Sequence, residues 1–550
     1  MTKATGETRG TSIPSQLVEK AFGYRGEVAL KRLEGKLIEM EQVVMSRQMR
    51  ALEWNSEYLG VSRLQLMENA GKGVAREIAL KFKPKDNEVM ILAGLGGKGG
   101  DGCVAARHLA CMEFKVSVVL VGRPEDIETQ ETKWNWETAQ LMRSTVTTSS
   151  AQDSSSLPEI HSSIVIDALL GIGVRGRVRP PILQAIDRIN ASRGFKVSID
   201  LPTGIDPDTG EVQGSAVKSN LTITLHRAKP GLARAREYVG ELTVIDIGIP
   251  PEAEIFSGPG DALLTQKPRP RESKKGDFGS LLVIGGSETY SGAPALVALA
   301  ALRTGVDLTF IAAPEKTAHV ISSMSPSLIT LKLSGEHLNT RNLREIAPAL
   351  GRATSVVIGP GLGLHEESAK TVDKILILAE KAKMPILIDA DALKAFARFK
   401  RRLKTPAVLT PHAGEYRTLT GENPPDDLNT RIDHVMRSAQ ELGAVILLKA
   451  RALKGSVDII SDGRRVKLNS TGNPGMTVGG TGDTLSGIVG ALLAQRADPF
   501  EAASTGAFLN GAAGDFAASE KGYHLIPSDL IDWIPKVMDD PMSHLKVRRP

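Results

Sequence analysis

Short apolar runs alternate with segments of helical periodicity along most of this chain, in two successive blocks. The runs are rich in Val, Ile and Leu, as are strands that helices cover on both faces of a parallel sheet. Consecutive parallel strands need crossover connections, and a helix is the usual one. The pattern therefore predicts an α/β protein with two doubly wound domains, of which the N-terminal one is Rossmann-like. Each domain should bind its ligand beyond the carboxyl ends of its strands.

The two expected domains are residues 45–249 and 271–540. A chain of 550 residues exceeds what one core usually holds, which independently favours two domains. Residues 1–44 should form an N-terminal extension, with apolar residues at helical spacing over 27–44. Residues 250–270 should be a linker, because prolines and glycines there are expected to break any element. The expected strands are residues 88–93, 116–121, 163–169, 195–200, 221–225, 242–247, 280–285, 307–313, 355–359, 385–389 and 444–449, and helices are expected at 292–304 and 365–382.

Composition excludes several classes of function. Hydrophobic residues make up 41% and charged residues 24%, with a formal net charge of +5, as in soluble globular proteins. Aromatic residues are only 4% and no basic cluster is interleaved with them, so we expect no nucleic-acid partner. No apolar run reaches the roughly 18 residues of a membrane span, and the N-terminus lacks the apolar core of a signal peptide. Cys103 and Cys111 lack CxxC spacing and fit a reducing compartment, so we expect a cytoplasmic protein.

A glycine-rich stretch, TGNPGMTVGGTGD at residues 471–483, stands directly ahead of an expected helix. Its five glycines leave backbone amides unshielded, and a helix start behind them adds the positive end of a dipole. Such a turn is suited to hold an anion. Asp483 at the helix entrance can serve as a general base, or merely as a cap of the helix.

Three loops of the first block follow expected strands and carry carboxylates. Residues 94–102 are glycine-rich and include Asp101, residues 167–177 begin with Asp167, and Asp200 ends the next strand. The first loop satisfies the GxGxxG pattern of nicotinamide dehydrogenases. Extra glycines and an aspartate crowd it, however, and no acid cleanly ends the second strand, so that class is disfavoured. The three loops together offer amides for phosphate, and carboxylates that can contact hydroxyls, move a proton or coordinate a cation.

Five motifs of the first block resemble, in order and spacing, the epimerase domain that acts on hydrated NADH and NADPH. They are LMENAG (residues 66–71), GGKGGDG (96–102), DALLGIGVRG (167–176), DLPTGIDPDTG (200–210) and AKPGL (228–232). The resemblance implies that Asp200 is the catalytic proton carrier. It implies a substrate site formed by Gly97, Lys98, Gly99, Gly100, Asp101, Gly171, Ile172, Gly173, Val174, Arg175, Gly176, Arg177 and Asp200.

The same resemblance implies a potassium ion between Lys98, Asp167 and Thr203. The epimerase family has two asparagines where this chain has Gly97 and Lys98. A charged lysine offers only hydrogen-bond donors and cannot ligate potassium. Two hypotheses follow: the ammonium of Lys98 substitutes for the ion against Asp167, or the epimerase half is impaired.

Motifs of the second block resemble the dehydratase branch of the ribokinase-like family, which repairs the same hydrates with a nucleotide. They are KGDFGSLLVIGGS, YSGAPALVALAALRTG, GPGLG, TPHAGE and NPGMTVGGTGD. The resemblance implies a ribokinase-like sheet, ADP as co-substrate and Mg²⁺ with it. Contacts to the hydrated nicotinamide are implied for Ala293, Gly361, His412 and Asp483. Contacts to the nucleotide are implied for Lys449, Ala450, Arg451, Ala452, Leu453, Gly480, Thr481 and Gly482.

Two assignments stay open at the level of sequence. The usual Lys-Gly-Ala after the strand reads Lys449-Ala450-Arg451 here, with Lys454 shortly after, so either lysine could reach the phosphates. His412 stands in a Pro-His-x-Gly-Glu turn after a strand, where it could contact the ligand or serve the turn alone.

Hydroxide leaves carbon poorly, whereas phosphate leaves well. The expected chemistry is transfer of the terminal phosphate of ADP to the substrate hydroxyl, followed by elimination of phosphate, which yields AMP, phosphate and NAD(P)H. Asp483 would be the general base, the amides of residues 480–482 would offset developing charge, and Glu415 could help through water. The dehydratase uses one epimer, the S hydrate, so the epimerase supplies it from the R hydrate.

Two rival functions share these features. A ribokinase-like kinase would release a stable phosphorylated alcohol. The N-terminal domain could also be a non-catalytic interaction scaffold. Doubly wound domains of this kind often assemble, so we expect a homo-oligomer.

Overall fold

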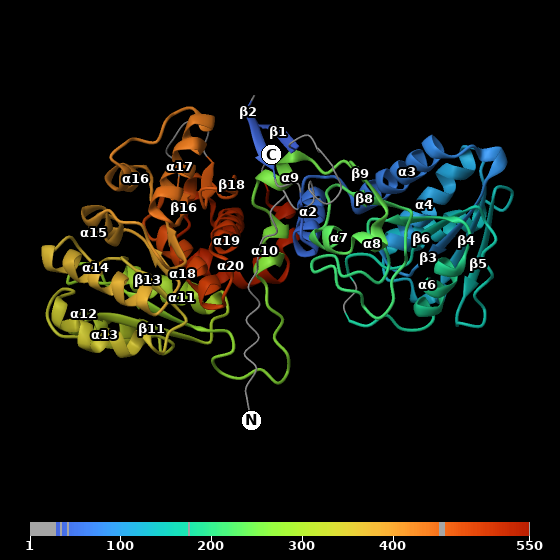
Figure 1. Cartoon of the computed structure of the whole chain (residues 1–550). Coiled ribbons are helices and arrows are strands. Elements are labelled where there is room, and N and C mark those ends of the chain that lie inside the picture. The colour runs from blue at the N-terminus through green and yellow to red at the C-terminus, as the bar shows by residue number, and fades with distance from the viewer. Residues whose placement is uncertain (1–28, 34–35, 41–42, 174–175, 450–456, 549–550) are drawn as a thin grey trace. The chain divides into compact units, whose positions relative to one another are not determined.

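The computed structural model describes residues 29–33, 36–40, 43–173, 176–449 and 457–548. The chain divides into two compact units, Met1–Pro251 and Glu252–Pro550 (Figure 1). Each unit is built around one large sheet in which parallel pairing dominates, which confirms the expected fold class. Among the described residues, no helix is both long enough and apolar enough to cross a membrane.

In the described part of the first unit, seven parallel strands form the large sheet, in the order β5-β4-β3-β6-β7-β8-β9. The order reverses between β3 and β6, so the carboxyl ends of these two strands form the switch point where open α/β sheets bind ligands. β5, with the polar sequence VTTSSA, lies at one edge and outside the expected strands. The strands are β3 (Glu88–Ala93), β4 (Lys115–Val121), β5 (Val146–Ala151), β6 (Ile164–Ala168), β7 (Phe195–Ile199), β8 (Leu221–Leu225) and β9 (Glu241–Ile245).

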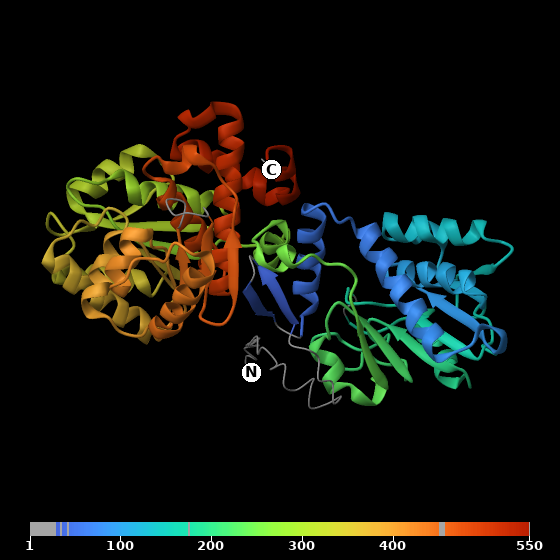
Figure 2. The ribbon, with the colours of Figure 1, turned by 90° about the horizontal axis from the view of Figure 1, so that it is seen from above.

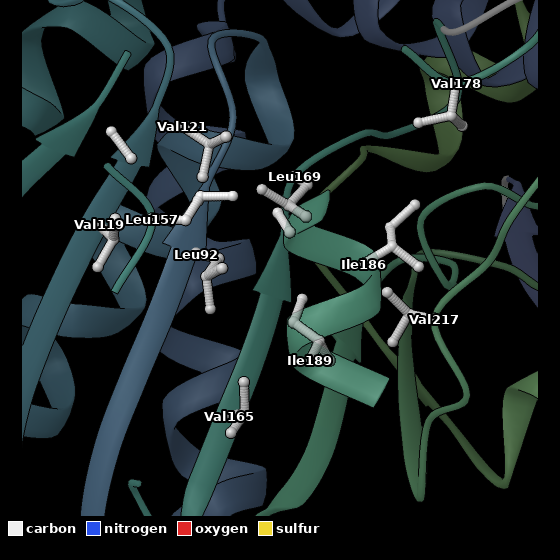
Figure 3. Packing of buried hydrophobic residues seen from close by; sticks show 12 residues of the cluster. Leu92, Val119, Val121, Leu157, Val165, Leu169, Val178, Ile186, Ile189 and Val217 are labelled. Atoms are coloured by element: carbon white, nitrogen blue, oxygen red, sulfur yellow. The ribbon is translucent and has the colours of Figure 1, made fainter. Parts of the chain in front are cut away.

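Helices cover both faces of this sheet. A Cβ at Gly102 in α4 would lie 2.6 Å from Ala168 Cβ, so α4 packs on the face of β6 to which Ala168 points. Successive strand side chains point to opposite faces. On the other face, Ile186 and Ile189 of α6 join Val165 in a buried apolar cluster (Figure 3). The helices are α2 (Ser46–Tyr58), α3 (Arg63–Lys81), α4 (Gly97–Cys111), α5 (Gln130–Leu141), α6 (Ile182–Ala191), α7 (Pro230–Arg234) and α8 (Arg236–Val239).

The helix expected over residues 27–44 is wrong. Where the structure describes these residues, β1 (Ala29–Leu33) and β2 (Lys36–Met40) pair as antiparallel strands. Leu33 pairs with Lys36, and a sequence spacing of two residues that includes a glycine is a signal for a hairpin. The apolar pattern did not distinguish a helix from a strand, because residues four apart lie on the same face in both.

In the part of the second unit that the structure describes, nine strands form the sheet, in the order β12-β11-β10-β13-β14-β15-β16-β17-β18. β17 pairs antiparallel with both β16 and β18, and the other pairs are parallel. β12, β15, β17 and β18 lie outside the expected strands, and of these β12 and β18 are the edge strands. The strands are β10 (Ser280–Ile284), β11 (Leu308–Pro314), β12 (Ile329–Leu333), β13 (Ser355–Ile358), β14 (Ile386–Ile388), β15 (Ala407–Leu409), β16 (Val445–Leu448), β17 (Asp458–Ser461) and β18 (Val466–Asn469).

α18 is the central helix of this unit, and it lies beside α19 in both views (Figures 1 and 2). It packs against β10, β13 and β14 and against α11. A Cβ at Gly487 would lie 2.4 Å from the Val297 carbonyl oxygen, so the close approach of α18 to α11 requires glycine. The longer helices are α11 (Gly292–Arg303), α12 (Glu315–Met324), α13 (Leu343–Leu350), α14 (Glu366–Lys381), α15 (Asp391–Phe399), α16 (Ala413–Thr420), α17 (Leu428–Leu442), α18 (Thr481–Ala494), α19 (Pro499–Lys521) and α20 (Pro527–Asp539).

The expectation that prolines and glycines break any element between residues 250 and 270 is wrong. α9 (Pro251–Ile255) and α10 (Pro259–Thr265) lie there, and each begins at a proline. Proline is tolerated in the first turn of a helix, where its missing N–H would have no partner. The Asp261 carbonyl accepts a hydrogen bond from Thr505 Oγ1 at 2.7 Å, so α10 is fixed to α19.

Candidate active sites

The glycine loop of the first unit leads directly from β3 into α4. Gly96 is the N-cap of α4, so the amides of residues 97 and 98 lie in the first turn and lack intrahelical partners. The Gly99 amide donates to the Gly96 carbonyl at 2.9 Å. A Cβ at Gly94 would lie 1.9 Å from the Leu169 carbonyl oxygen, so glycine allows the loop to approach the end of β6. A Cβ at Gly97 would meet nothing within 4 Å. The helix start therefore borders open space at the switch point, as an anion site requires.

Lys98, Asp167 and Thr203, the positions expected for potassium, are brought together in the structure. Lys98 Nζ donates hydrogen bonds to Asp167 Oδ2 at 3.1 Å, Thr203 Oγ1 at 3.1 Å and the Leu201 carbonyl at 2.7 Å. Burial lowers the pKa of Lys98, and the negative charge of Asp167 opposes that shift. The ammonium therefore lies in direct contact with the other two positions.

Asp200 lies just beyond β7 with a φ of 64°, in the left-handed region that residues other than glycine rarely adopt. Its Oδ1 accepts hydrogen bonds from the Leu225 amide at 3.1 Å, from Thr224 Oγ1 at 3.2 Å and from the Lys229 ammonium. Lys229 is fully buried and also donates to the Leu225 carbonyl at 2.9 Å. These contacts fix the orientation of the Asp200 carboxylate at the carboxyl ends of β7 and β8.

Two other carboxyl groups, those of Asp101 and Glu53, interact electrostatically with Asp200. Burial raises the pKa of Asp101 well above its ordinary value, and the charges of Asp200 and Glu53 raise it further. Burial also raises the pKa of Glu53, in α2, to about 7, although Arg63 opposes the shift. The raised pKa favours the protonated form of Asp101, which can donate a hydrogen bond.

Lys229 and Glu53 were not expected as site residues. Lys229 could have been recognised from the sequence, because it is the one charged residue of the AKPGL motif and follows a strand expected to be buried. Glu53 lies on a helix that precedes every recognised motif, and nothing in its local sequence distinguishes it from a surface glutamate.

The expected loop over residues 171–177 lies partly beside Lys98. A Cβ at Gly171 would be 3.4 Å from Lys98 Cβ, and Gly173 borders open space. Ile172 instead packs against a buried apolar cluster, so its side chain serves the core.

Of residues 174–177, the rest of that loop, the described part shows no contact that indicates a ligand site. Gly176 adopts a φ of 82°. Arg177 lies beside Gly214, where a Cβ would be 3.2 Å from Arg177 Cγ. Val174 and Arg175 lie outside the described residues.

In the second unit, the glycine turn leads into α18. Gly480 is the N-cap of α18 with a φ of 103°, and its carbonyl accepts the Thr484 amide at 3.1 Å. Residues 481–483 are the first helical positions, so their amides have no intrahelical partner. A Cβ at Gly479 would meet nothing within 4 Å. The turn thus presents free amides and the positive end of a helix dipole to open space.

Asp483 lies in the first turn of α18, close to an ion pair. Burial raises the pKa of Asp483 to about 7, and the charge of Asp389 contributes to the rise while Lys449 opposes it. Asp389 accepts hydrogen bonds from Lys449 Nζ at 3.1 Å and from Ser486 Oγ at 2.7 Å. A Cβ at Gly482 would lie 3.6 Å from Lys449 Nζ, so Lys449 borders both Asp389 and the turn.

Asp515 of α19 fixes the beginning of the turn. Its Oδ2 accepts the Gly472 amide at 2.7 Å, and its Oδ1 accepts Asn473 Nδ2 at 2.9 Å. Asp515 Oδ2 also lies 3.0 Å from Nε2 of the buried His544, near the C-terminus. Asp515 and His544 were not expected, because they lie on a helix and a terminal segment outside the glycine motif.

Of the expected nicotinamide contacts, Ala293 and Gly361 lie together. A Cβ at Gly361 would be 3.5 Å from Ala293 Cβ. His412 is exposed and is the N-cap of α16, where its Nδ1 accepts the Gly414 and Glu415 amides at 3.0 and 3.2 Å. The ring caps the helix, and its Nε2 lies 3.5 Å from Glu415 Oε1, so in this structure His412 serves the turn.

The remaining nucleotide positions cannot be compared with the geometry. Ala450, Arg451, Ala452, Leu453 and the alternative Lys454 lie outside the described residues. Among the residues that the structure describes, no group of three or more His, Cys, Asp and Glu side chains is arranged to hold a metal. Magnesium that is bound mainly by nucleotide phosphates needs only one or two carboxylates from the protein.

Two family models match the chain. Residues 281–536 match the model described as NAD(P)H-hydrate dehydratase, and residues 63–231 match the model described as YjeF-related protein N-terminus. A bifunctional NAD(P)H-hydrate repair enzyme of Pyrobaculum aerophilum is 46% identical over 502 residues, covering 90% of this chain and 98% of that protein. The chain belongs to this family of bifunctional repair enzymes.

A second bifunctional repair enzyme matches over a similar length, and a solved dehydratase matches about half of the chain. The repair enzyme of Hyperthermus butylicus is 42% identical over 507 residues, which cover 91% of this chain and 93% of that protein. A crystal structure of the ADP/ATP-dependent NAD(P)H-hydrate dehydratase of Bacillus subtilis, co-crystallised with ATP and Mg²⁺, is 28% identical. It covers 51% of this chain and 96% of that chain, with a TM-score of 0.42. Membership in the family confirms the resemblance of the two blocks to an epimerase and a dehydratase.

Proposed function

We propose that this repair enzyme acts on hydrated NADH and NADPH in two steps. The first unit interconverts the R and S hydrates. The second unit dehydrates the S hydrate to NAD(P)H with consumption of ADP, and it releases AMP and phosphate. The observation that carries the proposal is the position of Asp483, a carboxyl with a pKa of about 7 in the first turn of α18, beside Lys449 and the glycine turn.

The dehydratase step begins with transfer of the terminal phosphoryl group of ADP to the substrate hydroxyl. Asp483 takes the hydroxyl proton, the oxygen forms a bond to phosphorus, and the bond between phosphorus and the AMP oxygen breaks. The amides of residues 481 and 482 offset the charge that develops on the transferred group. Magnesium, when bound with the nucleotide, supplies further neutralisation of phosphate charge. Lys449 adds a fixed positive charge beside Gly482.

Elimination then restores the dihydronicotinamide. The lone pair of the ring nitrogen expels phosphate from the neighbouring carbon, and the next carbon loses a proton to re-form the double bond. The sum is one hydrate and one ADP converted to one NAD(P)H, one AMP and one phosphate. ADP drives the step because phosphate is a far better leaving group than hydroxide.

The epimerase step inverts the carbon that bears the hydroxyl. A bond to this carbon must break and re-form on the other face, with movement of a proton, and we assign Asp200 as the proton carrier. Lys229 orients its carboxylate. The raised pKa of Asp101 removes an objection to a pyrophosphate at this loop, because a protonated carboxyl donates a hydrogen bond to phosphate instead of repelling it.

The test is incubation of the mixed hydrate epimers with ADP, with ATP or with neither nucleotide, followed by absorbance of the reduced nicotinamide. Complete conversion with ADP is the expected result, since the R hydrate reaches the dehydratase through the epimerase. Conversion that stops near half would contradict the epimerase assignment. Accumulation of a stable phosphorylated product would favour a kinase instead.

A further inference from the structure

Lys98 lies where α4, the end of β6 and the turn after β7 meet. Its Nζ is 2.7 Å from the Leu201 carbonyl oxygen, 3.1 Å from Thr203 Oγ1 and 3.1 Å from Asp167 Oδ2. A carbonyl, a hydroxyl and a carboxylate are the oxygen donors that hold hard cations in proteins. The Lys98 side chain is only 3% exposed, so the ammonium has exchanged its water for these three oxygens.

The surrounding hydrogen bonds show that these oxygens face Lys98 as acceptors. The Leu201 carbonyl can only accept. Thr203 Oγ1 gives its proton to Asp167 Oδ1 at 2.5 Å and accepts the Leu170 amide at 3.0 Å, so it also accepts from Nζ. Asp167 Oδ2 is a carboxylate oxygen. Three acceptors around one nitrogen need three N–H groups, and only the protonated amine supplies three.

We propose that Lys98 is a tethered ammonium that takes the place of potassium in the epimerase half, which therefore works without that ion. The inference rests on the proposed epimerase function. Potassium does not fit here, because Lys98 Nζ already contacts both Asp167 and Thr203 and offers the ion no lone pair. The family resemblance implies the ion at these positions, and this chain departs from it.

The ammonium also has a positioning role. It ties the first turn of α4, which borders the expected phosphate site, to Leu201 and Thr203, which lie one and three residues after Asp200. Asp167 also accepts hydrogen bonds from Ser198 Oγ and the Thr203 amide, but these donors are neutral, and a buried carboxylate still needs a countercharge. Lys98 meets that need from within the chain, which favours a working epimerase over an impaired one.

The test compares the full-length chain with its Lys98→Asn and Lys98→Met variants in potassium chloride, sodium chloride and tetramethylammonium chloride at one ionic strength. Melting temperatures and the rate of epimer exchange are measured in each salt. Lys115→Met is the matched control, because Lys115 lies at the start of β4 and its side chain is exposed. The wild-type chain and this control should give the same values in all three salts.

Lys98→Asn should lose exchange by at least about tenfold in tetramethylammonium and regain it in potassium, because the amide oxygen completes an oxygen site for the ion. Its melting temperature should rise with potassium concentration. Lys98→Met should melt roughly 10 °C lower in every salt, without rescue. A wild-type exchange rate or melting temperature that falls when potassium is replaced would overturn the inference, as would a Lys98→Met variant indistinguishable from wild type.

Failure of the proposed function would look different. If the wild-type chain exchanged no epimers in any salt, the epimerase assignment would be lost. The melting temperatures would still decide whether Lys98 occupies a cation site, since a potassium-dependent rise in Lys98→Asn does not require activity.

Discussion

The ammonium of Lys449 donates a hydrogen bond to Asp389 Oδ1 at 3.1 Å. Burial alone would raise the pKa of Asp389, but Lys449 and the hydroxyl of Ser486 hold it below its usual value, so Asp389 is ionised. Burial raises the pKa of Asp483 to about 7, the fixed negative charge of Asp389 contributes to the rise, and Lys449 opposes it. Burial and the neighbouring ion pair therefore act together on the proton affinity of the proposed base.

The pH dependence of dehydration should report Asp483. Below its pKa the carboxyl is protonated and cannot accept the hydroxyl proton, so kcat/KM for the S hydrate should rise with pH and level off above about 7. Initial rates at saturating ADP, measured across this range, provide the check. A rate that falls with rising pH through neutrality would contradict the role of Asp483 as base.

Lys449→Met should shift that profile. Removal of the ammonium raises the pKa of Asp483, so the midpoint should move to higher pH. The variant should also be less stable by about 3 kcal/mol, because a buried carboxylate loses its partner. Urea unfolding and the pH profile measure the two effects. Lys394→Met is the matched control, since Lys394 pairs with Asp391 on a more exposed surface; equal effects in both variants would refute the special role of Lys449.

Asp515→Ala should loosen the glycine turn. The Gly472 amide loses its acceptor and Asn473 Nδ2 keeps only the Gly514 carbonyl, so the turn is less well ordered for the nucleotide. We expect the KM for ADP to rise about tenfold, with a smaller effect on kcat. Asp532→Ala, an exposed change on α20, serves as the control. A lower kcat with an unchanged KM would indicate that Asp515 does not position the turn.

Asp200→Asn should separate the two activities. Epimer exchange should fall by about 100-fold or more, because an amide cannot carry the proton. Dehydration of the pure S hydrate should be unchanged, since the reaction belongs to the other unit. NMR of the hydrate mixture follows exchange, and Asp187→Asn, on the exposed side of α6, is the control. Normal exchange in Asp200→Asn would support a non-catalytic scaffold instead.

The regular parts of the fold could be predicted from the sequence. Apolar runs such as β3 and β8 coincide with the expected strands, because burial on both faces demands continuous hydrophobicity. Edge strands such as β5 and β18 could not be recognised this way, since exposure relaxes that demand. β1 and β2 were mistaken for a helix because the local apolar spacing fits both periods.

The residues of the candidate sites also divide into those that the sequence predicted and those that it did not. Motif residues such as Asp483 and Asp200 lie at strand ends and helix starts, as the topology of doubly wound sheets requires. Glu53 and Asp515 reach their sites from distant helices, and only tertiary packing brings them there. The contact between Lys98 and Asp167 was one of two hypotheses that the sequence left open, and the structure contains the contact.

The account depends most on the claim that Asp483 activates the substrate hydroxyl toward the terminal phosphate of ADP. The direct measurement is product stoichiometry from the pure S hydrate and ADP, for the wild-type chain and for Asp483→Asn, with NAD(P)H, AMP and phosphate quantified together. We predict equal amounts of the three products from the wild type and a rate at least about 100-fold lower from the variant. Formation of NAD(P)H without AMP, or an unimpaired Asp483→Asn variant, would contradict the account.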